Sequence, residues 1–187
     1  MITREEALKF LNEKIENKNI IKHLVAAEAI MRALAKKFAK NMEEEWGLAG
    51  LLHDADYSSD VPENLQGIQV SQYLAERGFE VSEEIKHAMA AHNHATGVTP
   101  KSLMDWSLFC IDPLSGLIVA TTLVMPDKKL ASVKPESVLK KFKDPSFARG
   151  TRREDLKMCE EKLGIPLAEF IKIGLETMQK ISQELGL

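Results

Sequence analysis

Hydrophobic residues recur at the spacing of an α-helix along most of this chain, and no segment shows the alternation of a half-buried strand. Residues 101–124 are apolar on most sides and are therefore expected to form a central helix. Other helices are expected over residues 3–14, 18–40, 42–55, 64–76, 82–92, 151–163 and 166–185. This pattern predicts an all-α, single-domain helical bundle of about eight helices.

One of these helices ends on two polar residues in an apolar setting. Leucine, alanine and glycine fill positions 48–52, and His53 and Asp54 follow directly. A buried imidazole and carboxylate are costly unless they are paired or bind a cation. A simpler interpretation is a helix end at which both side chains face water, because the polar residues 56–60 come next. The choice between these interpretations depends on partners elsewhere in the chain.

Two such partners occur in similarly apolar segments. His23 lies on or beside the apolar face of the second expected helix, and Asp112 lies halfway along the central one. Two imidazoles and two carboxylates form a ligand set that suits divalent ions such as Mn, Fe, Ni or Zn. Adjacent residues on a helix point about 100° apart, so a neighbouring pair can bind one ion only near a helix end. We therefore predict one ion held by His23, His53, Asp54 and Asp112.

The order of these four residues resembles the motif of the HD-domain superfamily of metal-dependent phosphohydrolases. The flanking segments also resemble that family: Gly50-Leu51-Leu52 before the His-Asp pair and Pro113-Leu114-Ser115-Gly116 after the last aspartate. The resemblance is closer to small bacterial HD hydrolases, which continue into a lysine-rich segment such as residues 137–143 here. It runs from about His23 to the C-terminus.

The resemblance implies an HD-type bundle with a metal site between central helices. We expect a metal-binding core over about residues 18–125, followed by a basic segment and C-terminal helices over 126–187. The implied activity is hydrolysis of a small phosphorylated metabolite or nucleotide through a metal-activated water. The implied cofactor is one divalent ion, for which Mn, Fe, Ni, Zn and Mg are all candidates.

Many HD proteins have two further histidines between the His-Asp pair and the last aspartate, and these bind a second metal. In this sequence His92 stands at the second of those positions, whereas Gln66 stands at the first. An amide oxygen is a poor substitute for imidazole, so this departure argues against a second ion and against the di-iron oxygenases of the superfamily. His92 is then expected to line the pocket, as a proton donor or through a water. His87 and His94 match no family position and are expected at the surface.

The chain after Pro126 is rich in lysine and arginine, which most simply form solvated helix faces. The loop 143–150, however, sets Arg149 between small residues, and Thr151 is expected to open the next helix. A helix N-terminus with neighbouring arginines suits a phosphate group. We expect the substrate phosphate to be bound by Arg149 and by Lys140 or Lys143. We expect Asp54 both to bind the metal and to orient the water, with His92 as the candidate acid or base.

The composition argues against several classes of partner. The net charge of −3 does not favour nucleic acid or an anionic membrane. The two cysteines are neither paired by spacing nor set in a zinc motif, which favours a reduced compartment. The acidic start does not match a secretory signal, and the apolar stretch 114–125 is shorter than a membrane span. These features predict a cytoplasmic protein, and the family resemblance adds a small phosphorylated substrate as its expected partner.

Two other functions remain open. A sensor or adaptor could retain the metal core and bind a nucleotide or phosphorylated ligand without turnover, and Gln66 favours this alternative. A structural metal could instead accompany RNA or nucleotide binding by the basic residues between 128 and 153. Strong weakening of the binding by salt would support that second alternative.

Overall fold

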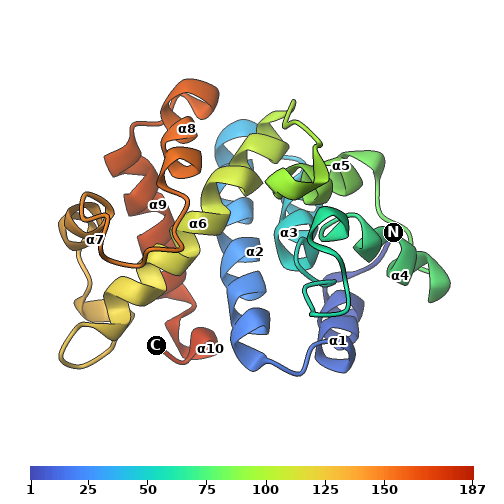
Figure 1. Ribbon diagram of the computed structural model, residues 1–187, viewed down its shortest axis with the longest axis horizontal. Coiled ribbons are helices and arrows are strands. Elements are labelled where there is room, and N and C mark those ends of the chain that lie inside the picture. The colour runs from blue at the N-terminus through green and yellow to red at the C-terminus, as the bar shows by residue number, and fades with distance from the viewer.

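The central apolar segment forms helix α6 (Leu103–Leu123), and Figure 1 shows it crossing the molecule diagonally. The computed structural model describes residues 1–187, and all of its regular elements are helices. On one side of α6 lie α1 (Arg4–Lys14), α2 (Lys18–Phe38), α3 (Glu43–Leu52), α4 (Gln69–Glu76) and α5 (Glu83–Ala91). On the other side lie α7 (Pro135–Phe142), α8 (Arg153–Leu163) and α9 (Leu167–Lys180), while α10 (Ser182–Leu185) returns towards α2.

The prediction of an all-α bundle is confirmed, with ten α-helices in place of about eight. The additional elements are α7, which falls in the basic segment, and α10, which is separated from α9 at Ile181. Three short 3-10 helices also occur: η1 (Glu63–Leu65), η2 (His94–Thr96) and η3 (Leu130–Ser132). The helix expected over 64–76 is shorter than predicted, because Gly67 takes a φ of 87° and interrupts the chain before α4.

Helix α6 is buried by the two groups of helices on either side of it. Its length of 21 residues and the mean hydropathy of 1.4 over an 18-residue stretch match a membrane-spanning helix. However, 67% of that stretch is buried inside the molecule. Such burial is typical of the core helix of a soluble protein. The helix begins at Leu103 and continues through Pro113 to Leu123, close to the expected range 101–124. One continuous set of buried hydrophobic residues extends from Ile2 to Leu185, so both groups of helices share one core.

Helices α2 and α3 approach each other closely at Gly50. A Cβ atom at this position would lie 2.8 Å from the backbone carbon and oxygen of Ala27 and 2.9 Å from the backbone nitrogen of Glu28. Only glycine therefore allows this separation of the two backbones. The close packing brings α3 against Ala27 and Glu28 of α2, about one turn after His23.

A buried carboxylate further ties the first three helices together. Glu28 of α2 is 2% exposed and accepts hydrogen bonds from Arg4 at 2.7 Å and from Arg32 at 2.9 Å. Arg32 also binds Glu44 at the start of α3, at 2.7 Å. Charge-assisted bonds of this kind offset the cost of burying the Glu28 carboxylate. They hold α2 and α3 in the register that the candidate site requires.

Candidate metal centre

The structure brings together the four residues that were predicted to bind metal. His23 comes from α2, His53 and Asp54 directly follow α3, and Asp112 lies in the middle of α6. One donor atom from each of the four residues lies within 4.8 Å of the others. The two imidazoles approach to 3.2 Å between their Nε2 atoms.

The end of α3 explains how two adjacent residues reach the same centre. The last helical residue is Leu52, His53 is the C-cap, and Asp54 lies in the turn that follows. His53 is completely buried, whereas the Asp54 side chain is 19% exposed. The expectation that the pair stands at a helix end is confirmed.

Each of the two imidazoles is oriented by a hydrogen bond at its outer nitrogen. The Nδ1 of His53 donates to the Gly50 carbonyl oxygen at 2.8 Å, because a carbonyl can only accept. The Ser115 hydroxyl donates to the Asp112 carbonyl at 3.0 Å, so its oxygen accepts from the Nδ1 of His23 at 2.9 Å. Both Nε2 atoms therefore face the centre and each other, where they can bind a proton or present their lone pairs to a metal cation. This donor set fits a divalent metal ion.

The two carboxylates each direct one oxygen into the centre and one away from it. The Oδ2 of Asp54 lies 3.9 Å from His23 Nε2 and 3.7 Å from His53 Nε2. The Oδ1 of Asp112 lies 3.2 Å and 3.8 Å from the same two nitrogens. The outward oxygens contact His92 Nε2 at 3.1 Å and Arg152 Nη2 at 2.6 Å, respectively. These outer cations hold both carboxylates in position.

The charges of the centre shift the pKa values of its members strongly. Burial alone would raise the pKa of Asp54, but the charge of His53 and the hydrogen bond from His92 outweigh it and lower the pKa to about 2. Burial is likewise outweighed at Asp112, where hydrogen bonds from His23 and His53 hold the pKa well below its usual range. Burial would lower the pKa of His23 and His92, but their bonds to Asp112 and Asp54 raise it. Without a metal, these histidines therefore hold protons in the centre.

These shifts predict a pH dependence for the stability of the metal-free protein. Because the pKa values of His23 and His92 are raised, protonation of these groups stabilises the fold fully at pH values below 6.5, the usual histidine pKa. This contribution is lost as the pH rises through the raised pKa values. The lowered pKa values of Asp54 and Asp112 stabilise it above about pH 4, and this contribution is lost as the pH falls further. We expect these four groups to stabilise the metal-free protein most between about pH 4 and pH 6.5.

Urea denaturation of the chelator-treated protein at pH 5.5 and pH 8.5, with and without added Zn²⁺, measures this effect. The denaturation midpoint should fall at the higher pH, and Zn²⁺ should restore it there more strongly than at pH 5.5 because it must displace protons from the histidines. A His23→Gln variant should lose part of both effects. A Zn²⁺ effect that is equal at the two pH values would contradict this assignment.

His92 is held directly beside the centre rather than reaching it through a water. It is the C-cap of α5, is 4% exposed, and donates from Nδ1 to the Met89 carbonyl at 2.5 Å. Gly67 packs against this turn, where a Cβ atom would lie 2.3 Å from the Met89 oxygen and 3.1 Å from His92 Cε1. The buried carboxylate of Asp56 anchors Gly67 by accepting from its backbone nitrogen at 2.9 Å. Burial raises the pKa of Asp56.

Gln66, expected at the second-metal position, occupies the same loop. Its side-chain amide donates to the Val61 carbonyl at 3.3 Å, and no hydrogen bond joins it to the four clustered residues. The structure therefore brings His92 to the centre but does not bring Gln66 there. The reason is local, because the turn at Gly67 is held by Asp56 and by the end of α5.

A polar cleft of about 370 Å³ opens next to the centre. Its walls combine two of the clustered residues with the loop before α8: His23, Asp112, Pro113, Gly116, Ala148, Arg149, Gly150, Thr151 and Arg152. Arg149 is therefore near the centre, as predicted. Helix α8 begins at Arg153, two residues later than the expected start at Thr151, with Arg152 at its N-cap.

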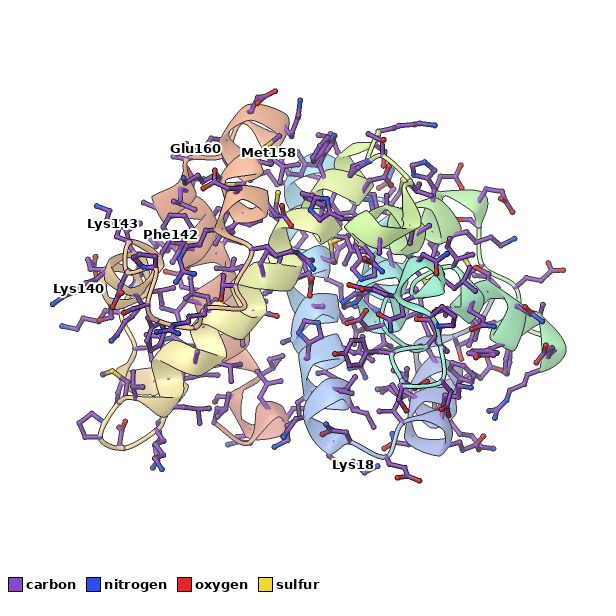
Figure 2. All side chains as sticks on the ribbon, in the orientation of Figure 1. Lys18, Lys140, Phe142, Lys143, Met158 and Glu160 are labelled. Atoms are coloured by element: carbon purple, nitrogen blue, oxygen red, sulfur yellow. The ribbon has the colours of Figure 1, made fainter.

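Lys140 and Lys143, the other predicted phosphate ligands, are not among the residues that line this cleft. Helix α7 buries Val138 and Phe142, which turns both lysines into solvent. Figure 2 shows them at the outer edge of the molecule. The lysine-rich composition of the segment does not reveal this orientation.

Arg152 is a site residue that was not predicted. Besides Asp112, it contacts Asp155 at 2.7 Å, and Asp155 in turn contacts His94 Nε2 at 2.9 Å. The only sequence signal was its position beside Arg149 in the loop before α8. His94 is 60% exposed at the side chain, in agreement with the expected surface position. His87 is 30% exposed and contacts Asp105 at 2.9 Å.

Comparison of the chain with protein-family models, with curated proteins and with solved structures finds no match. The HD-type assignment accordingly stays a prediction, which is supported by the order of the four residues and by the place where their side chains meet.

Proposed function

We propose that this protein is a metal-dependent phosphohydrolase of the HD type that acts on a small phosphorylated metabolite. The observation that carries this proposal is the contact between the cluster and the polar cleft. His23 and Asp112 belong to both, and Arg149 and Arg152 complete the cleft wall. A phosphate group in the cleft would thus lie near the two guanidinium groups and near His23 and Asp112 of the cluster.

Each part of the site has a role in this proposal. A divalent ion held by His23, His53, Asp54 and Asp112 supplies Lewis-acid activation of water and of a phosphoryl oxygen. Arg149 and Arg152 neutralise and orient the phosphate oxygens through charge-assisted hydrogen bonds.

His92 is the candidate proton donor. Its Nε2 lies 3.1 Å from the outward oxygen of Asp54, to which a protonated His92 donates, and this contact raises the pKa of His92. A protonated imidazole in this position could pass its proton to a departing alkoxide. Asp54 keeps its other oxygen directed into the centre and so links the ligand set to the donor.

Metal analysis combined with a hydrolysis assay tests the proposal. We expect about one equivalent of a divalent metal in the purified protein, and hydrolysis of p-nitrophenyl phosphate that chelation removes and metal restores. Mn, Fe, Ni, Zn and Mg should each be supplied to the chelated protein. Binding of inorganic phosphate without turnover with any of these ions would overturn the proposal in favour of a non-catalytic binding module.

Replacing Arg149 with methionine should raise KM for a phosphorylated substrate by about tenfold or more, because a charge-assisted hydrogen bond contributes roughly 1.5–3 kcal/mol. Metal content should remain unchanged, since Arg149 is not among the clustered residues. Lys143→Met is the matched control, because it removes a positive charge outside the cleft and should leave KM close to the native value. An unchanged KM in the Arg149 variant, measured by steady-state kinetics, would exclude Arg149 as a phosphate ligand.

A further inference from the structure

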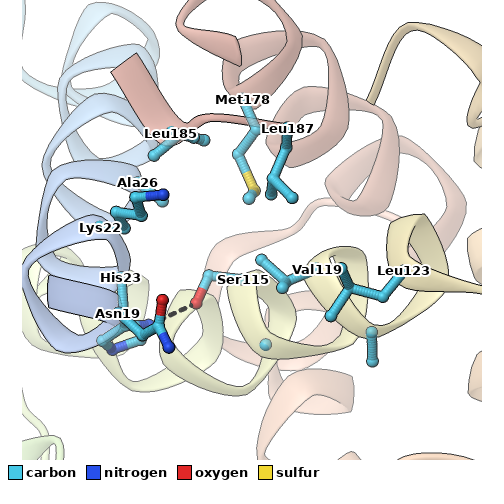
Figure 3. A pocket seen from close by; sticks show the side chains of 12 residues that line it. Asn19, Lys22, His23, Ala26, Ser115, Val119, Leu123, Met178, Leu185 and Leu187 are labelled. Carbon is cyan, nitrogen blue, oxygen red and sulfur yellow. Dashed lines mark hydrogen bonds between the residues drawn. The ribbon is translucent and has the colours of Figure 1, made fainter. Parts of the chain in front are cut away.

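A second cavity, of about 390 Å³, lies on the other side of His23 from the polar cleft. It is bounded by α2, α6 and the C-terminal helices α9 and α10. Figure 3 shows Met178, Leu185 and Leu187 on one side of it and Val119 and Leu123 on the other, with His23 and Ser115 at one end. A cavity of this size suits a small organic ligand.

This cavity adjoins the polar cleft beside the candidate metal centre. His23 and Gly116 line both the second cavity and the polar cleft. A Cβ atom at Gly116 would meet nothing within 4 Å, so no side chain is packed against α6 at the point where the two spaces adjoin. This arrangement would let one ligand extend from the cleft into the cavity.

The two spaces differ in the residues that line them. Hydrophobic residues are the majority in the cavity: Ala26, Val119, Ala120, Leu123, Met178, Leu185 and Leu187. Its polar members are Asn19, Lys22, His23 and Ser115, and the Ser115 hydroxyl is already engaged between His23 and the Asp112 carbonyl. Asn19 and Lys22 are exposed residues of α2. The surface formed by α6, α9 and α10 is therefore mainly apolar, and the polar residues lie towards α2.

We propose that the substrate is a phosphate monoester with a compact apolar group, which binds in this cavity while the phosphate binds in the cleft. This inference rests on the proposed function for the position of the phosphate. Burial of the apolar group would supply affinity, and His23, which lines both spaces, would lie beside the ester oxygen that joins them.

Calorimetric titration of the metal-loaded protein with methylphosphonate and hexylphosphonate tests the inference independently of turnover, because a phosphonate is not hydrolysed. Each buried methylene contributes about 0.8 kcal/mol, or about fourfold, so hexylphosphonate should bind at least about 30-fold more tightly. Ala120→Phe should fill the cavity and bring the ratio of the two affinities close to one. Ala131→Phe, the same change at an exposed position outside the cavity, should leave the ratio unchanged.

A second variant keeps the test valid if Ala120→Phe does not fold. Val119→Ser removes apolar surface without adding volume, and it should lower the affinity ratio severalfold. Equal binding of the two phosphonates by the native protein would overturn the inference, even if phosphate esters are hydrolysed. Tighter binding of adenosine monophosphate than of hexylphosphonate would also overturn it, by showing a polar ligand in the cavity. A preference for hexylphosphonate without hydrolysis of hexyl phosphate would support the inference and overturn the proposed function.

Discussion

Replacing Asp54 with alanine is expected to remove the bound metal and to lower phosphate-ester hydrolysis on the order of 10³-fold, because Lewis-acid activation contributes several kcal/mol. Asp54 supplies one of the four donor atoms that lie within 4.8 Å of one another. The variant also deprives His92 of its only carboxylate partner, so the candidate proton donor loses its orientation as well. No neighbouring carboxylate replaces it, since Asp56 is engaged by the backbone nitrogens of Gly67 and Val70.

Elemental analysis and steady-state kinetics of the purified variant measure both effects. Asp60→Ala is the matched control, because Asp60 is an exposed carboxylate in the same loop and lies outside the cluster. The control should keep the metal and the activity. Retention of a full equivalent of metal by Asp54→Ala would show that Asp54 does not hold the ion.

Replacing Gly50 with alanine should destabilise the protein by about 1–3 kcal/mol, as is typical of overpacking in a well-packed interior. The added methyl group would lie 2.8 Å from backbone atoms of Ala27, which cannot rotate away as a side chain could. Helix α3 must therefore move away from α2. Because the Gly50 carbonyl also accepts from His53 Nδ1, the same movement should weaken metal binding.

Gly116→Ala provides a control in the opposite direction. It makes the same chemical change in the interior of α6, but its Cβ atom meets nothing within 4 Å. The higher helix propensity of alanine should stabilise this variant by up to about 1 kcal/mol. Urea denaturation followed by circular dichroism gives both free energies of unfolding. If the two variants had equal free energies of unfolding, the close approach of α2 and α3 would not require glycine at position 50.

The helices were largely predictable because their signals are local. The Thr3–Glu6 capping box opens α1 as expected, and Ser82 caps α5. The misses occurred where local signals conflict with packing. Helix α7 was not predicted, because only Val138 and Phe142 of its residues are buried and its apolar pattern is therefore short. Helix α4 is shorter than predicted, because hydrogen bonds to Asp56 hold Gly67 outside it.

The four clustered residues were predictable because polar groups are rare in the middle of apolar helices, and such groups require partners. Their outward contacts were not predictable in the same way. Arg152, at the start of α8, donates to Asp112. The sequence of the basic segment contains several arginines and lysines, and nothing in it shows which of them contacts Asp112. Only the packing of α7 and α8 distinguishes Arg149 and Arg152, which line the cleft, from Lys140 and Lys143, which face solvent.

The sequence by itself thus determined the helical class, the central place of α6, and the four residues that meet at the end of α3. These properties depend on periodicity, on caps and on the cost of burying unpaired polar groups, all of which act over a few residues. The tertiary structure alone decided the direct contact of His92 with Asp54, the arginine-lined cleft, and the apolar cavity beside His23. These features arise where helices distant in sequence approach one another, so they depend on the angles and separations of whole helices.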